Sequence, residues 1–252
     1  MKDPYDSLIP IFRAERIPQR IQQHGTGVYF KLNGDTYLLT AAHVIDNSEP
    51  GQLLVPGPES LIPIAGNMYS SFIGDESRNN DTADFALFKL GTECKKALNH
   101  HFSPFPQTRT ELLTSSLELG CCSISGYPVS KSKNKAGHLS SEIYSFRGAA
   151  AKAATYEKLG LDPSTNIIVH YDRSRSVYPN TLQPFPGPAL KGVSGGAIFS
   201  WPKEHALSDD WSIPLLVGIF HTYHKDAGLA VGSLLMPYIA TIGLMQMKEE
   251  QA

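Results

Sequence analysis

Cysteine is scarce in this chain of 252 residues, which contains only three, two of them adjacent. Because Cys94, Cys121 and Cys122 cannot all pair within one molecule, the sequence lacks the disulfide framework of small secreted domains. The first residues lack the basic stretch and apolar run of a signal peptide, and no apolar run is long enough to cross a bilayer. We therefore expect a protein of a reducing cytoplasm, without a membrane partner.

An excess of either charge is also absent, because the formal net charge is −2. Without a basic field to attract phosphate, nucleic acid is not expected as a partner. A sustained helical period is missing too, and short apolar segments are bounded by Gly, Pro, Asn and Asp, which favours an all-β protein. Strands are expected at residues 61–64, 85–90, 122–125, 167–171, 197–201 and 215–223.

The clearest local pattern is a hairpin over residues 27–42, where apolar and polar residues alternate on both sides of Asn33-Gly34. Asn-Gly tolerates the positive φ angles of a two-residue hairpin turn. A helix is expected from about Pro237, because apolar residues follow it at helical spacing. Residues 149–161 suit a helix or a long hairpin arm, and the polar residues 131–137 suit a surface loop.

Three short motifs, read in order, carry candidate chemistry: residues 40–43 (TAAH), 82–87 (TADFAL) and 192–196 (GVSGG). A serine hydroxyl is a poor nucleophile at neutral pH and needs a base that a third group orients. Ser194, His43 and Asp84 are candidates for these three roles. Residues 192–196 also fit the nucleophile elbow of α/β-hydrolases, but there the acid and the histidine follow the serine. The order His, Asp, Ser is the chymotrypsin order.

On these motifs, together with residues 216–220 (LVGIF), the chain resembles the trypsin-like serine peptidases. The resemblance implies a single chymotrypsin-like domain over residues 1–252, with two antiparallel β-barrels packed face to face and a C-terminal helix. The first barrel is expected at about residues 1–110, and the second barrel with the helix at about 111–252. The implied activity is that of a bacterial, intracellular serine endopeptidase that cleaves a protein or peptide substrate through an acyl-enzyme.

The resemblance also implies roles for individual residues. His43 would be the general base, Asp84 would orient it, and the N–H groups of Gly192 and Ser194 would form the oxyanion hole. Asp81 is the rival carboxylate, and we expect it to be a solvated turn residue. Val193 departs from the digestive members of the family, which carry there an aspartate that pairs with a newly cut N-terminus. Activation by such a cut is therefore not implied, and the hole is either preformed or ordered by something else.

Substrate-binding residues are implied at Pro188, Ala189, His221, Thr222 and Tyr223, with residues 228–231 as a third wall. No acidic residue falls where a basic side chain would be recognised, so cleavage after Lys or Arg is disfavoured. His221 would either bond an acidic or amide side chain or lie as a strand histidine facing solvent. His221 and His224 lack a third ligand for zinc, and we expect neither a metal nor a cofactor.

Two other functions remain open at the level of sequence. One is a catalytically silent trypsin-like fold that serves as a binding module, and the other is a serine esterase that does not act on peptides. By family habit, an activating or target protein partner and a role in bacterial defence or stress are plausible.

Overall fold

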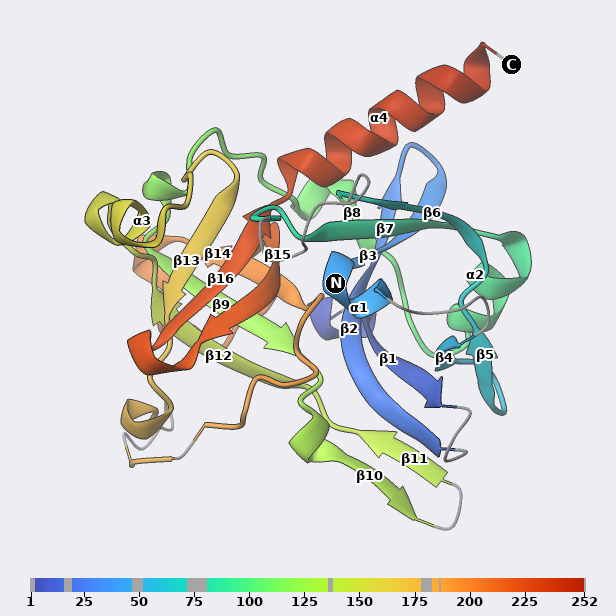
Figure 1. Ribbon diagram of the computed structural model, residues 1–252, viewed down its shortest axis with the longest axis horizontal. Helices are drawn as coiled ribbons and strands as arrows, with labels where there is room; N and C mark the ends of the chain where they lie inside the picture. Colours follow the sequence, from blue (N-terminus) through green and yellow to red (C-terminus); the bar gives the residue numbers. More distant parts are fainter. Residues whose placement is uncertain are drawn as a thin grey trace.

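Short alternating segments build two antiparallel sheets that lie side by side, with a helix at the end of the chain (Figure 1). The computed structural model describes residues 3–15, 20–46, 52–71, 81–135, 138–177, 183–185 and 187–251. The described helices give no segment that is both long and apolar enough to span a membrane.

The first sheet has eight strands, in the order β5-β4-β1-β2-β3-β7-β6, with β8 paired to β2. All of its pairings are antiparallel except that of β8 with β2. Its strands are β1 (Leu8–Glu15), β2 (Arg20–Leu32), β3 (Asp35–Ala41), β4 (Leu53–Pro56), β5 (Leu61–Pro63), β6 (Gly66–Ser70), β7 (Phe85–Leu90) and β8 (Phe105–Pro106). Two short helices, α1 (Ala42–Ile45) and α2 (Thr92–Leu98), follow β3 and β7.

The second sheet has six strands, in the order β12-β9-β14-β15-β16-β13, and all its pairings are antiparallel. Its strands are β9 (Cys121–Gly126), β12 (Tyr144–Ala149), β13 (Asn166–His170), β14 (Ala197–Trp201), β15 (Leu215–His224) and β16 (Leu229–Leu234). A separate hairpin of β10 (Ser132–Lys135) and β11 (His138–Ser141) projects from the body, and the helices of this half are α3 (Ala153–Leu159) and α4 (Met236–Glu250) (Figure 1).

Single turns of 3₁₀ helix fill several connections between these elements. They lie at Pro4–Ser7, Gln107–Arg109, Ser116–Glu118, Val129–Lys131, Arg173–Arg175, Lys203–His205 and Lys225–Ala227.

The hairpin predicted around Asn33-Gly34 is confirmed. β2 pairs with β3 from Val28↔Leu39 to Leu32↔Asp35, and the two turn residues have φ angles of 50° and 90°. These positive angles match the twist of the two strands, which explains the residue types at the turn. The hairpin brings His43, in α1, to the end of β3.

The six predicted strands are all present, with ends that agree or differ by one residue, and α4 confirms the helix near Pro237. For residues 149–161 the sequence allowed a helix or a hairpin arm, and the structure has the helix α3. Residue 149 is the last residue of β12. The prediction of a surface loop at residues 131–137 is wrong for most of these residues. Residues 132–135 form β10, which pairs with β11, and residues 136–137 lie outside the described residues.

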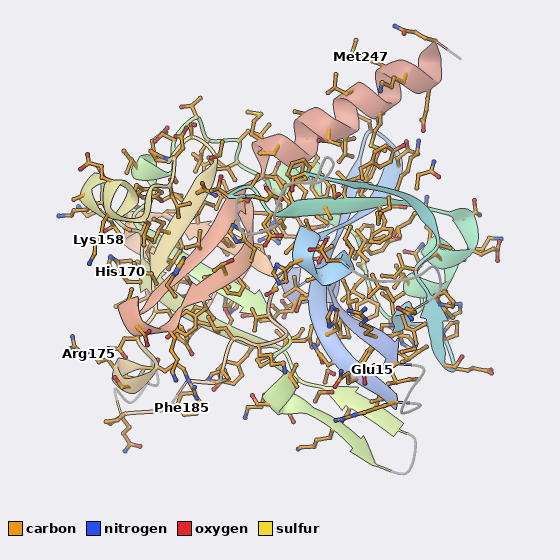
Figure 2. The ribbon with its side chains drawn as sticks, in the orientation of Figure 1. Glu15, Lys158, His170, Arg175, Phe185 and Met247 are labelled. Carbon is orange, nitrogen blue, oxygen red and sulfur yellow. The ribbon has the colours of Figure 1, made fainter. Side chains whose placement is uncertain are left out.

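A shared apolar core joins the two sheets and the base of α4. Phe105 of the first sheet and Phe199 of the second have ring centroids 5.8 Å apart, while Tyr238 and Ile242 of α4 are fully buried against the same cluster. Burial of each such side chain stabilises the fold by roughly 1.5–3 kcal/mol. The outer part of α4 extends beyond this core, where Met247 is exposed (Figure 2).

The cysteines predict how the stability of the protein responds to a reductant. All three are free thiols, and burial raises the pKa of the Cys122 thiol to about 12. Because the fold contains no disulfide among the described residues, a reductant should leave the thermal midpoint unchanged. All three thiols should react with an alkylating probe once the unreduced chain is unfolded. A fall of several degrees with reductant would contradict this prediction.

Candidate active site

A histidine of α1 and a carboxylate that precedes β7 form a close pair. His43 Nδ1 lies 2.6 Å from Asp84 Oδ2, and the backbone N–H of His43 donates to Asp84 Oδ1 at 2.9 Å. The Asp84 side chain is 8% exposed and the His43 side chain 38%. A buried carboxylate thus fixes the orientation of an imidazole that solvent can reach, which is what a general base requires.

The backbone of Asp84 is held in an unusual conformation by its neighbours. Its φ angle is 38°, a left-handed value that is uncommon for residues other than glycine. Its carbonyl oxygen accepts from the N–H of Ala42 at 2.9 Å, and its N–H donates to Asp81 Oδ1 at 3.0 Å. The hydroxyl of Ser71 also donates to Asp81.

Asp81 is therefore more than the solvated turn carboxylate that we expected. It accepts the N–H groups of Ala83 and Asp84, and so shapes the turn that presents Asp84. An aspartate that accepts N–H bonds two and three residues ahead is typical of turns, and this local signal was available in the sequence. Among the described residues, the carboxylate that bonds to His43 is that of Asp84, whereas Asp81 bonds to the turn.

Ser194 lies in a glycine-rich turn that precedes β14 of the second sheet. The turn is held against β15 by the bond from Gly195 N–H to the Phe220 carbonyl at 2.7 Å. The Ser194 hydroxyl donates to the carbonyl oxygen of His221 at 3.0 Å, and within the described part of the chain it makes no hydrogen bond to His43. In structures without substrate, catalytic hydrogen bonds are often long or not yet formed.

Two backbone donors of this turn are free. The N–H groups of Val193, Gly195 and Gly196 donate to carbonyl oxygens, whereas among the described residues those of Gly192 and Ser194 have no acceptor. The φ angles of Gly192 (88°) and Gly195 (85°) are positive, which a residue with a side chain adopts only under strain. Two free donors, one on either side of Val193 and close to a serine hydroxyl, are an arrangement that can stabilise an oxyanion. They are the two residues for which the sequence predicted this role, and the role stays a prediction.

The predicted substrate-binding walls meet at a residue that sequence reasoning missed. Tyr171, which is 3% exposed, donates its hydroxyl to the Pro188 carbonyl at 3.0 Å and its N–H to the Gly228 carbonyl at 2.8 Å. The hydroxyl of Tyr223 donates to the Tyr171 carbonyl at 3.2 Å. A single buried tyrosine thus bonds to all three walls. Tyr171 follows β13 immediately. Its hydrogen bonds join residues that are far apart in the sequence, so no local pattern predicts them.

The exposure of the predicted binding residues is uneven. Ala189, Thr222 and Tyr223 are partly exposed, whereas Pro188 and His221 are buried. Their role toward a substrate stays a prediction.

His221 faces the carboxylate of the pair. Its Nδ1 lies 2.9 Å from Thr222 Oγ1 and 3.7 Å from Asp84 Oδ2, while its buried Nε2 has no partner among the described residues. Burial lowers the pKa of His221 to about 4 despite the opposing charge of Asp84. We assign the proton of this neutral ring to Nδ1, because there both neighbouring oxygens can accept it. Of the two roles considered for His221, the strand histidine facing solvent is therefore wrong, since 7% of the residue is exposed.

No arrangement for a metal ion is found within the described ranges, where three or more His, Cys, Asp or Glu side chains never gather suitably.

Comparison with known proteins finds similarity in structure but not in sequence. No family model matches the chain, and no curated protein matches it in sequence. The structure of the VesB protease of Vibrio cholerae matches with a TM-score of 0.52 at 16% identity, over 93% of this chain and 63% of that one. The protease Anisep from Arthrobacter nicotinovorans matches with a TM-score of 0.54 at 12% identity, over 92% and 91% of the two chains.

The chain has a chymotrypsin-like fold. The expected fold class is confirmed, as two curled antiparallel sheets with a C-terminal helix. At these identities the likeness establishes the fold alone, and the chain spans less than two thirds of the VesB structure.

The buried His221 predicts how stability depends on pH. Its folded pKa of about 4 lies below the ordinary 6.5, so between these values the unfolded chain binds more protons than the folded one. The free energy of unfolding should fall as the pH decreases from about 6.5 to about 4, by up to about 3 kcal/mol from this residue. Urea unfolding at several pH values measures the loss.

The matched control is His221→Gln, which keeps a polar side chain but cannot titrate. Its stability should depend less on pH in the same window. His24, whose pKa burial also lowers, is present in both proteins and cancels in the comparison. Equal slopes for the two proteins would contradict the prediction.

Proposed function

We propose that this protein is a serine endopeptidase that cleaves a protein or peptide substrate through an acyl-enzyme. The observation that carries the proposal is the His43–Asp84 pair, with Nδ1 and Oδ2 2.6 Å apart, in a fold shared with proteases. The free N–H groups of Gly192 and Ser194 add a site for the charge that develops during acyl transfer.

In the proposed mechanism, Ser194 attacks the carbonyl carbon of the scissile bond while His43 removes the proton of its hydroxyl. Asp84 keeps the Nδ1 proton of His43 directed toward itself, so that Nε2 is free to accept. The hydroxyl must first leave the carbonyl of His221, which is a rotation about the Cα–Cβ bond of one residue. His43 then protonates the leaving amine, and water releases the acyl group by the reverse sequence.

The same proposal includes a reducing bacterial cytoplasm as the compartment, supported by the three free thiols. It includes a protein substrate or partner, because the fold is one that proteases use.

Substitutions at the triad test the proposal directly. Ser194→Ala and His43→Ala should each remove nearly all turnover, by about 10⁶-fold, and the double variant should lose little more. Asp84→Asn should cost about 10⁴-fold, because the amide favours the wrong tautomer of His43. Labelling with a fluorophosphonate, followed by mass spectrometry, should place the probe on Ser194.

Asp81→Asn is the matched control for Asp84→Asn. Its amide oxygen can still accept the two turn N–H groups, so its loss should be much smaller. Equal loss at both positions would show that the carboxylates had been assigned wrongly. A protein that folds but never takes up the probe would instead be the silent binding module, a reading favoured by the bond from the Ser194 hydroxyl to His221. Cleavage of short esters without peptides would identify an esterase.

The prediction that basic residues are disfavoured has one further ground, a cation beside the first wall. Arg173 donates from Nε to the carbonyl of Gly187 at 2.8 Å, directly beside Pro188. A lysine or arginine before the scissile bond would approach this cation, so peptides with either residue should be cleaved more slowly than matched neutral peptides. Cleavage of a peptide library, read by mass spectrometry, measures the preference. Faster cleavage after Lys or Arg would contradict the prediction.

A further inference from the structure

The turn that carries Ser194 is fixed from the opposite sheet by one threonine. Thr26, in β2, is fully buried. Its N–H donates to the carbonyl of Ser194 at 2.8 Å, and its hydroxyl donates to the carbonyl of Gly192 at 2.8 Å. The same hydroxyl accepts from the N–H of Tyr127 at 3.0 Å, so its hydrogen-bonding capacity is well used.

The bonds from Thr26 fall on alternate carbonyl groups of the turn. Peptide groups are planar, so fixing the carbonyl of Gly192 also fixes the plane that it shares with Val193. The neighbouring carbonyl of Lys191 accepts from Val129 N–H at 2.8 Å. The free N–H groups of Gly192 and Ser194 share their planes with the carbonyls of Lys191 and Val193, which accept from Val129 and Gly196. Thr26 holds the two peptide planes that alternate with them, and so limits how the turn can move.

Val193 anchors the same turn by packing. It is 1% exposed and belongs to the apolar core of the second sheet. Its N–H donates to the Leu190 carbonyl at 2.9 Å, and its carbonyl accepts from Gly196 at 2.8 Å. The residue before the serine is therefore held by apolar contacts and backbone bonds, without a charged partner.

We infer that Thr26 is a positioning residue whose hydroxyl holds the turn of residues 191–195 in the form that can bind an oxyanion. This inference rests on the proposed function and adds how its site is kept ready. The turn is ordered by the fold itself, because the hydroxyl of Thr26 and the side chain of Val193 both contact it in this structure. Through the turn, Thr26 helps to stabilise the charge that develops in the transition state. It does not contribute to binding of the substrate.

Three variants separate the hydroxyl from the packing. Thr26→Val keeps nearly the same shape and the backbone bond to Ser194, but loses the bond to Gly192 and the bond from the Tyr127 N–H. Thr26→Ser keeps the hydroxyl and loses a methyl group. Thr36→Val makes the same chemical change at a buried threonine of β3, away from the turn, and controls for the general cost of the substitution.

The main measurements are the rate of fluorophosphonate labelling of Ser194, and kcat and KM for a peptide or ester. Thr26→Val should lower kcat and the labelling rate by about 10- to 100-fold, because an oxyanion donor is misplaced, and should leave KM within about twofold. Thr26→Ser should restore most of the loss. Thr36→Val should retain wild-type rates. If Thr26→Val does not fold, Thr26→Ala provides the same loss of the hydroxyl.

A folded Thr26→Val or Thr26→Ala protein with wild-type rates would overturn the inference and leave the proposed function standing. A loss that Thr36→Val shares, or that Thr26→Ser fails to restore, would also overturn it, since packing alone would then explain the result. If the wild-type protein takes up no probe, the proposed function fails by itself. Amide chemical shifts and hydrogen exchange of Gly192 and Ser194 then test the turn without activity. Unchanged shifts and exchange in a folded variant without the hydroxyl would overturn the inference.

Discussion

One contact between the two sheets decides whether the candidate site exists, the bond from Thr26 N–H to the Ser194 carbonyl at 2.8 Å. His43 follows β3 and Asp84 precedes β7, so the first sheet carries both. Ser194 lies in the turn before β14 of the second sheet. Since neither sheet holds the complete set, the bond from β2 to that turn holds Ser194 against the sheet that carries the pair.

The glycines beside the serine follow from this close approach. A Cβ atom on Gly195 would lie 1.9 Å from the carbonyl oxygen of Thr26 and 2.2 Å from the hydroxyl of Thr40, so no side chain fits there. A Cβ atom on Gly192 would lie 2.9 Å from the Tyr127 carbonyl, and its φ of 88° already favours glycine. The glycines in residues 192–196 are therefore explained by the contact between the sheets as well as by the candidate chemistry.

Local patterns explain what could be predicted from the sequence. The β2–β3 hairpin follows from alternation and the Asn-Gly turn, and β7 from an apolar run after a polar turn. β10 could not be found in this way, because its residues are polar and its partner strand and the Ser141–Gln23 bond hold it in place. The order of the motifs indicated the candidate triad. The roles of Thr26 and Tyr171 could not be predicted, because each bonds to residues that are distant from it in the sequence.

Replacing an ion pair by packing changes what can regulate such a site. A carboxylate beside the serine would need a cationic partner, and the turn would form only when that partner arrived. Val193 and Thr26 depend on no such event, because an apolar contact and a hydroxyl bond form as the sheets come together. The remaining adjustable element is the Ser194 hydroxyl, now bonded to the His221 carbonyl. Releasing that bond costs about 1 kcal/mol, so under the proposed function the binding of a substrate would be enough to free the hydroxyl.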